Sequence, residues 1–355
     1  KAFVDETFDF QGRFLTGVKE QLPRWKRCTE ATDRTLGESL GAEYVKLKFT
    51  PEQEKAANEM IDHIFAAMKT RIQNLTWMSD ATKQKALAKL AGYKRKIGYN
   101  RHPRGYAGLK IDRSSYADNI RRATEFQIAR NAQDIGKPTD KTRWGFTPPT
   151  VNAQYSSTNN DITFPAGILQ PPFFNFAADD AINYGGMGAV IGHEISHGFD
   201  DQGSKYDAEG NLNMWWTPED RTKFEERANC VINQFNEYEV LPGLKIKGQR
   251  TIGENIGDLG GLNVAYTALM DDLKDKGPQP QIDGFTPEQR FFLGWAQVWA
   301  AKATEQGLRL QVETDPHAWA RWRVDGPLSN MREFAKAWGC KLGDHMVREK
   351  PCVIW

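Results

Sequence analysis

The sequence has no apolar run of the roughly 18 residues that a membrane-spanning helix needs. It also has no surplus of one charge, because 47 Lys and Arg oppose 46 Asp and Glu and leave a formal charge of +1. This balance gives no indication of a nucleic-acid partner or of binding to a membrane surface. With 355 residues, 39% of them hydrophobic and 26% charged, the composition predicts a soluble globular chain of one large or two ordinary domains.

Cysteine is also scarce. The four cysteines, Cys28, Cys230, Cys340 and Cys352, are too few for a disulfide-rich miniprotein and lack the C-x-x-C spacing of a structural zinc site. Buried free thiols are compatible with this number, and so are disulfides in an oxidising compartment. The residues alone leave both alternatives open.

Helix-start signals recur along the chain. Thr50–Gln53 combines a capping hydroxyl, a proline at the first helical position and an acidic first turn, and apolar residues follow at helical spacing. Ser79–Asp80 predicts another helix, which ends at Gly92. The same start signature appears at Thr217–Asp220 and at Thr286–Gln289. The sequence therefore predicts a mainly helical protein.

Two short strands are predicted near the middle of the chain. Residues 94–112 are rich in Gly, Pro, Arg and Tyr and are interpreted as a connection, and a polar helix is expected over residues 116–130. Val151–Tyr155 and Asp161–Phe164 have the composition of strands, separated by a turn at Ser156–Asn160. A strand at a sheet edge suits a protein that binds extended peptides.

Residues 193–197 read His-Glu-Ile-Ser-His. On a helix, positions i and i+4 lie on one face, so His193 and His197 can share one metal ion, and Glu194 can reach a water in an open coordination position. The preceding glycine-rich segment predicts a buried helix that packs closely against neighbouring backbone. A lone HExxH is only moderately specific, because it also arises by chance on surface helices. A third ligand is therefore the decisive feature.

A second acidic motif offers that ligand. If Gly253–Asp258 is helical, Glu254 and Asp258 lie one turn apart on one face. Two His and one Glu, with a position left for water, form the ligand set of catalytic zinc peptidases, whereas structural zinc sites are closed and usually rich in thiolates. Asp200 and Asp258 are candidates to accept hydrogen bonds from zinc-binding histidines. The alternative for each Asp is a solvated charge at a helix end.

Together the motifs resemble those of the neprilysin and endothelin-converting-enzyme family of zinc metallopeptidases. The likeness spans nearly the whole chain and rests on residues 151–157, 164–174, 191–200 and 253–261, on Asp315–His317 with Arg323 and Asn330, and on the C-terminal Cys-x-x-Trp of residues 352–355. It implies a mainly α protein with a small β-sheet (α+β). A thermolysin-like HExxH zinc-peptidase domain would occupy residues 116–355, and residues 1–115 would form part of a helical roof domain and a connection.

The resemblance implies one Zn²⁺ per chain. His193, His197 and Glu254 would bind it. Asp258 would orient His193 and contribute to catalysis, and Asp200 would orient His197.

The resemblance also implies roles around the substrate. Glu194 would be the general base that activates the zinc-bound water, and His317 would donate a hydrogen bond to the oxyanion of the tetrahedral intermediate. Asn152 would bind the substrate through its side chain and Ala153 through its backbone. Arg323 would bind a substrate carbonyl on the leaving-group side.

A pocket for the residue after the scissile bond is implied as well, and it would favour a large apolar side chain. Its lining would be Ile168, Phe173, Val190 and Trp299; ordinary core packing is the alternative for these four. Gln154 departs from the family, which often has Phe at that position, so contacts near the substrate strand are expected to differ.

For the cysteines, the resemblance pairs Cys230 with Cys352. Cys28 and Cys340 match positions whose partners lie upstream in family members, so they would be free thiols or attached to a segment outside this chain. A Cys28–Cys340 bridge is the alternative. A disulfide implies an extracytoplasmic location, which is secreted, periplasmic or in the ectodomain of a membrane-anchored protein. Because family members are longer, the upstream half of such a polypeptide is an expected partner.

The sequence therefore predicts a zinc metalloendopeptidase or oligopeptidase that cleaves short peptides on the amino side of large apolar residues, since a roof excludes folded proteins. The alternatives are a catalytically silent peptide-binding relative, a zinc hydrolase of another acyl substrate, and a peptidase active only with the upstream half. Glu194 argues against the silent relative, because a binding module needs no base beside the metal. Val151–Tyr155 argues against the other hydrolase, because a substrate strand serves extended peptides. The physiological substrate and the oligomeric state stay open.

Overall fold

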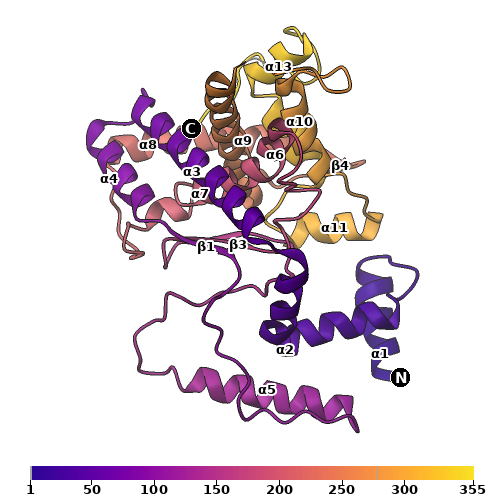
Figure 1. Ribbon diagram of the computed structural model, residues 1–355. Coiled ribbons are helices and arrows are strands. Elements are labelled where there is room, and N and C mark those ends of the chain that lie inside the picture. Colours follow the sequence, from indigo (N-terminus) through magenta and orange to yellow (C-terminus); the bar gives the residue numbers. More distant parts are fainter. Residues whose placement is uncertain (1, 278) are drawn as a thin grey trace.

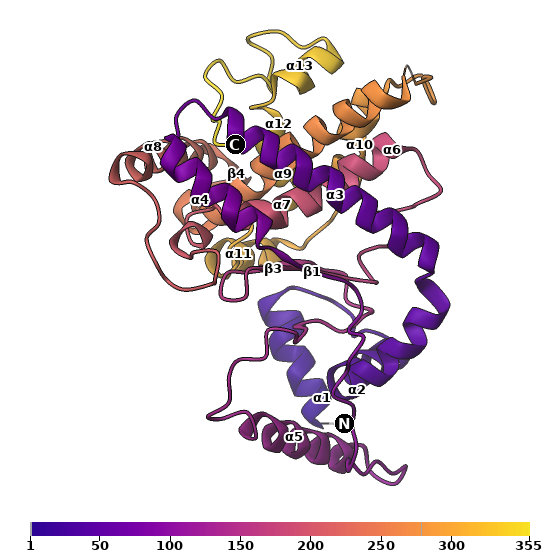
Figure 2. The ribbon, with the colours of Figure 1, turned by 60° about the vertical axis from the view of Figure 1, so that its left-hand side comes forward.

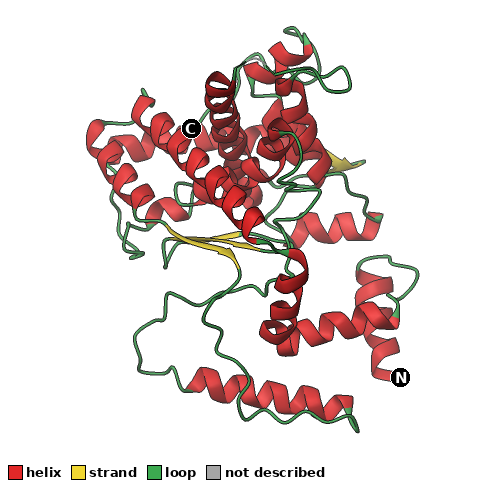
Figure 3. Cartoon of the chain, in the orientation of Figure 1, coloured by secondary structure: helices red, strands yellow, loops and turns green. Residues whose placement is uncertain are grey.

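The computed structural model describes residues 2–277 and 279–355 (Figures 1 and 3). Helices dominate the first part of the chain: α1 (Ala2–Thr7), the π-helix η1 (Phe8–Leu15), α2 (Arg24–Lys48), α3 (Pro51–Asn74), α4 (Asp80–Ala91) and α5 (Tyr116–Ala132). The later helices are α6 (Asp180–Asn183), η2 (Tyr184–Gly188), α7 (Ala189–His197), η3 (Gly203–Lys205), α8 (Pro218–Glu237), α9 (Gly248–Lys276), α10 (Pro287–Val298), α11 (Glu305–Thr314), α12 (Ala320–Leu328) and α13 (Arg332–Trp338). The strands are β1 (Lys94–Gly98), β2 (Gln154–Ser156), β3 (Asp161–Pro165), β4 (Glu239–Leu241) and β5 (Leu244–Lys245).

The predicted helix starts are confirmed by their caps. Thr50 accepts a hydrogen bond from the backbone N–H of Gln53, whose side chain returns one to Thr50, so α3 begins with a complete capping box. A second capping box precedes α10, and single hydroxyl caps precede α4 and α8. The polar helix expected from residue 116 is α5.

The sheet contains one strand that the sequence did not predict. Residues 94–112 were expected to be a connection, but their first five residues form β1, which pairs in parallel with β3. The basic composition concealed this strand, because Lys96 is buried through an ion pair with Asp161 (2.6 Å) rather than through an apolar side chain. β2 pairs antiparallel with β3 and forms one edge of the sheet, opposite β1, since the strand order is β1-β3-β2.

Helices α7 and α9 pack side by side at the centre of the helical body, and α3 lies across both (Figure 2). Their approach depends on glycine. A Cβ on Gly192 would lie 2.7 Å from the carbonyl oxygen of Gly261, and a Cβ on Gly257 would lie 2.7 Å from the ring of His193. The expected close packing of the glycine-rich metal helix is therefore confirmed.

A smaller helical lobe lies on the other side of the sheet from this body. It contains α1, η1, α2 and α5 (Figure 1). The hydroxyl of Thr304, just before α11, donates to the carbonyl of Thr16, which joins the lobe to the body. α3, α4 and β1 pack with the body. The division of the chain at residue 115 into a roof segment and a catalytic domain stays a proposal.

A disulfide joins Cys230 on α8 to Cys352, the pairing that the resemblance implied. Cys28 and Cys340 are free, so the alternative bridge between them is not formed. Within residues 2–277 and 279–355, no helix has the length and apolar character needed to cross a bilayer.

Candidate active site

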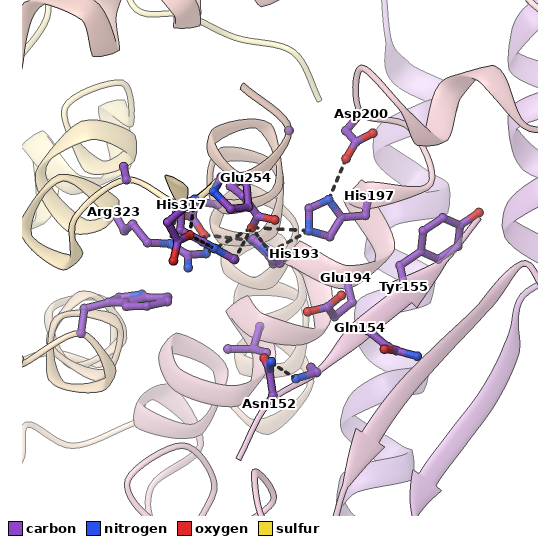
Figure 4. Close-up of a pocket in the computed structure, with 18 of the residues that line it drawn as sticks. Asn152, Gln154, Tyr155, His193, Glu194, His197, Asp200, Glu254, His317 and Arg323 are labelled. Atoms are coloured by element: carbon purple, nitrogen blue, oxygen red, sulfur yellow. Dashed lines mark hydrogen bonds and ion pairs between the residues drawn. The ribbon is translucent and has the colours of Figure 1, made fainter. Parts of the chain in front are cut away.

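The elements of the body bring the predicted metal ligands together (Figure 4). His193 and His197 lie one turn apart on α7, and Glu254 projects from the neighbouring α9. One ligand-type atom from each of the three lies within 4.8 Å of the other two. Gly253–Asp258 is helical, as the one-turn spacing of Glu254 and Asp258 requires.

Each histidine is held by a buried carboxylate on the side away from this cluster. His193 Nδ1 lies 2.9 Å from Asp258 Oδ1, and His197 Nδ1 lies 2.7 Å from Asp200 Oδ2. Because carboxylates only accept, the hydrogen bond between His197 and Asp200 places the proton on Nδ1 and leaves Nε2 with its lone pair toward the cluster. The Asp258 carboxylate is close to His193 Nδ1 without the geometry of a hydrogen bond, and its charge favours the same tautomer there.

These residues fit a metal ion. The two Nε2 atoms are 2.9 Å apart, and Glu254 Oε2 lies 3.2 Å from that of His193 and 3.7 Å from that of His197. That oxygen is buried and has no hydrogen-bond partner among the described residues. Three electron-pair donors that face one another cannot satisfy each other, whereas a cation bound by all three would.

The electrostatics of the site also favour a cation. Burial lowers the pKa of His193, but its close contacts with the charged carboxylates of Asp258 and Glu254 outweigh burial and raise the pKa to about 10. Burial raises the pKa of Glu254, yet its close contacts with His193 and His317 and the charges of His193 and His197 lower it below its usual range. The surrounding carboxylates thus stabilise positive charge at this point.

Glu194 is buried on α7, on the side of the cluster that faces the strand segment at Asn152 (Figure 4). Burial raises its pKa, and the charges of His193 and His197 oppose that shift. It makes no ion pair with the ligands within the described residues, so its carboxylate is available to a water or substrate in the cleft.

His317 lies on the loop between α11 and α12. Its Nε2 is 3.1 Å from Glu254 Oε2 and its Nδ1 is 2.7 Å from Asp315 Oδ1. Burial lowers the pKa of His317, but the close contact with the charged Glu254 outweighs burial, so the pKa is raised. Sequence reasoning assigned no role to Asp315, although an acidic residue two positions before a candidate histidine is a usable signal.

Arg323 on α12 is buried and forms a two-point ion pair with Asp258, with both N–O distances 2.7 Å. Its guanidinium carbon lies 3.9 Å from the ring centre of Trp299. Arg323, Asp258 and His193 therefore form a continuous chain of contacts that ends at the metal cluster.

The whole set opens into one cleft of about 1060 Å³. It is lined by every residue proposed for catalysis, metal binding, orientation of the metal ligands or substrate binding: Asn152, Ala153, Ile168, Phe173, Val190, His193, Glu194, His197, Asp200, Glu254, Asp258, Trp299, His317 and Arg323. Gln154 lines it too. Asn330 does not; it is buried and accepts a hydrogen bond from the backbone N–H of Cys352, so its position is explained by packing.

The sequence matches the family described as Peptidase family M13 over residues 152–354, and a second match to that family covers residues 1–100. An endothelin-converting enzyme homolog of Locusta migratoria is 39% identical over 100% of this chain and 50% of its own length. Neprilysin-3 of Drosophila melanogaster is 39% identical over 93% of this chain and 43% of its own length. The chain thus spans about half the length of the curated relatives it matches.

Solved structures give the same result for the fold. The zinc metalloprotease Zmp1 of Mycobacterium tuberculosis, in complex with an inhibitor, is 41% identical, with a TM-score of 0.95 over 100% of this chain and 55% of that one. PepO from Lactobacillus rhamnosis HN001 is 33% identical, with a TM-score of 0.84 over 95% of this chain and 52% of that one. The predicted α+β fold of a thermolysin-like metallopeptidase is confirmed.

Proposed function

Because this chain belongs to peptidase family M13, we propose that it carries the active site of a zinc-dependent endopeptidase that cleaves short peptides. One observation carries the proposal: His193, His197 and Glu254 converge beside Glu194 in a cleft bordered by the edge strand β2. A structural metal site would not need an unpaired buried carboxylate or an open cleft next to its ligands.

His193, His197 and Glu254 would hold one Zn²⁺ per chain, and the metal would supply Lewis acidity and lower the pKa of a water in the site. Glu194 would accept the proton of the attacking water and pass it to the leaving amine. Its burial supports this role, because a raised pKa makes the carboxylate a stronger base.

The negative charge that develops on the substrate carbonyl would be stabilised by the Nε2–H of His317. On the opposite side of the ring, the hydrogen bond between Nδ1 and Asp315 holds the imidazole in place and favours its protonated form. Arg323 would bind a substrate carbonyl on the leaving-group side. Its two contacts with Asp258 hold the guanidinium in place, so the same carboxylate would orient both Arg323 and His193.

An extended peptide would lie along the strand segment before β2. Val151–Ala153 lies outside the ladder with β3 and lines the cleft, where a substrate strand can reach it. The N–H of Ala153 donates to Asn152 Oδ1 (2.9 Å), a contact that a bound substrate would replace. Asn152 would bind through its carboxamide and Ala153 through its backbone. Ile168, Phe173, Val190 and Trp299 give the cleft an apolar wall, which supports a preference for a large apolar residue after the scissile bond.

We also propose that the chain works outside the cytoplasm and together with the upstream part of a longer polypeptide. The Cys230–Cys352 disulfide supports an oxidising compartment. The relatives, about twice as long, support an upstream part that would complete the roof and limit substrates to short peptides.

A peptide library followed by mass spectrometry tests the function, with the purified protein and with the full polypeptide that contains it. We expect cleavage before Phe, Leu, Ile or similar residues. Glu194→Gln should reduce the rate by roughly 10²–10⁴ while zinc content is unchanged, because Glu194 is a base and not a ligand.

Glu226→Gln, an exposed acid on α8, is the matched control and should retain full activity. Cleavage dominated by sites before Asp, Glu or Gly would contradict the pocket assignment. An active Glu194→Gln variant would contradict the mechanism. Binding of peptides without cleavage, by the full polypeptide as well, would favour the silent relative.

A further inference from the structure

Lys89 is a buried, ionisable residue that the mechanism does not use. It lies in the last turn of α4, is 1% exposed and has no carboxylate partner within 4 Å among the described residues. It does not line the cleft, so it cannot meet a substrate. A lysine in such a place needs another explanation, since burying an unpaired ammonium group is costly.

The explanation lies in the segment that follows the metal helix. Lys89 Nζ donates to the backbone carbonyls of Gly198, Gly203 and Tyr206, each at 2.7 Å. Three acceptors match the three N–H groups of an ammonium ion. The rings of Tyr155, Phe199 and Trp215 surround the same nitrogen at 5.7–5.8 Å from their centres, which adds cation–π attraction.

Two of the three carbonyls are closely tied to the metal site. Gly198 is the C-cap of α7, so the ammonium group lies at the negative end of the helix that carries both histidines. Gly203 accepts from Lys89 through its carbonyl and donates its N–H to Asp200 Oδ1 at 2.6 Å. A Cβ on Gly203 would lie 1.8 Å from the carbonyl oxygen of His197, so this segment folds directly onto the end of α7.

We propose that Lys89 is a positioning residue of the metal site: it anchors residues 198–206 so that Asp200 stays against His197. The chain of contacts runs from the ammonium group to the carbonyl of Gly203, and from the N–H of Gly203 to Asp200 Oδ1. It continues from Asp200 Oδ2 to His197 Nδ1. Lys89 thereby sets the orientation of one metal ligand without touching the metal, the ligand or the substrate. The inference rests on the zinc site of the proposed function.

The backbone of Lys89 extends the same network to the substrate side. Its carbonyl accepts from the side chain of Asn160, whose Oδ1 accepts from the hydroxyl of Tyr155 on β2. The end of α4 therefore contacts both the segment behind the metal helix and the strand beside the cleft.

A double-mutant cycle of zinc affinity tests the proposal, because it does not depend on peptidase activity. Lys89→Met removes the ammonium group and keeps the apolar stem. Losing a group that orients a ligand costs about 10–100-fold in metal affinity, so we expect Asp200→Ala to fall in that range and Lys89→Met to lose about tenfold. Since Lys89 acts through Asp200, the double variant should bind zinc no more than about threefold more weakly than Asp200→Ala alone. Lys85→Met, an exposed lysine on the same helix, should leave the affinity unchanged.

A second readout uses the metal-free protein. Nitrogen NMR of the His197 ring should find the proton on Nδ1 in the wild type and in Lys85→Met, and a mixture of tautomers in Lys89→Met. If Lys89→Met does not fold, Lys89→Arg takes its place in the cycle, because it keeps the charge but replaces a compact ammonium by a planar fork. Unchanged affinity, losses that multiply in the double variant, or an unchanged tautomer would each overturn the proposal. A wild type that binds no zinc would instead refute the proposed function, and the tautomer measurement would still decide the role of Lys89.

Discussion

At the scale of single residues, the site is built from pairs in which a carboxylate fixes a cation or a ring. Asp258 holds His193 and Arg323, Asp200 holds His197, and Asp315 holds His317. Fixed rings and a fixed guanidinium mean that little reorganisation is needed when a substrate arrives.

The sequence could predict the candidate ligands in two pairs, because helical spacing determines which residues share a face. His193 and His197 follow from one one-turn repeat and Glu254 and Asp258 from another, whereas helical spacing does not predict that the two pairs meet. The sequence could not predict the burial and the contacts of Lys89, because the first carbonyl that Lys89 binds lies 109 residues further along the chain. Nothing local distinguishes this lysine from the exposed Lys85 one turn earlier.

Glu254 provides the sharpest prediction at this scale. Glu254→Ala removes one of three ligands and leaves two imidazoles, so tight zinc binding should be lost. Zinc content by mass spectrometry after dialysis against a chelator measures this directly. Asp271→Ala, an exposed acid on the same helix, should retain about one zinc per chain. Full occupancy in Glu254→Ala would mean that the metal is held by other residues.

At the scale of elements, local capping signals predicted the helices well. The strands were predicted less well, because a strand depends on a pairing partner elsewhere in the sequence. The hydroxyl caps of α3, α4, α8 and α10 act within one turn, so a local pattern suffices to identify them. β1 instead depends on an ion pair between Lys96 and Asp161, which are 65 residues apart. β2 begins at Gln154 rather than Val151, because its ladder with β3 extends no further toward the cleft.

One buried carboxylate couples two of these elements and makes their stability depend on pH. Asp220, in the first turn of α8, accepts hydrogen bonds from the backbone and hydroxyl of Ser79 and from the hydroxyl of Thr82, at the start of α4. Burial raises the pKa of Asp220, but these hydrogen bonds outweigh burial and lower it from 3.8 to about 2.

The sign of the effect follows from proton binding. Between pH 4 and pH 2 the unfolded chain binds more protons at Asp220 than the folded one, so stability falls as the pH falls. Asp220→Asn should therefore lower the free energy of unfolding by about 2 kcal/mol at pH 6, a typical value for hydrogen bonds to a charged group. By pH 3 the difference from wild type should shrink to about half. Denaturant unfolding at both pH values measures it, with Glu219→Gln, the exposed neighbour, as control. A difference that does not change with pH would mean that the Asp220 charge contributes nothing.

At the scale of the whole molecule, the C-terminus closes the fold around the metal helices. Trp355 packs against Phe199 and Trp77, with ring centres 5.9 Å apart in both cases. A Cβ on Gly260 of α9 would lie 2.9 Å from Trp355. Arg71 on α3 donates to the carbonyl oxygen of Trp355, and Trp77 donates to that of Ile354. The last residues thus support α3 and α9, both of which pack against α7.

The sequence predicted this closure only through resemblance. Four cysteines allow three pairings, and no local pattern selects one of them. The contacts of Trp355 depend on residues from most of the chain, so they arise only once the helices have packed.

The disulfide that secures this end gives the last prediction. Cys230 and Cys352 are 122 residues apart, and a loop of that length stabilises the folded state by ~5 kcal/mol in the chain-entropy model. Replacing both by alanine should therefore lower the free energy of unfolding by about 3–5 kcal/mol, as measured by denaturant titration without reductant. Replacing Cys28 and Cys340 by alanine is the matched control. Because neither is bonded in the fold, that variant should change stability by less than about 0.5 kcal/mol. Since thiols react only when free, a thiol assay on the denatured wild type should detect two groups and not four. Four groups, or equal stability of the two variants, would show that the bridge does not hold the C-terminus in solution.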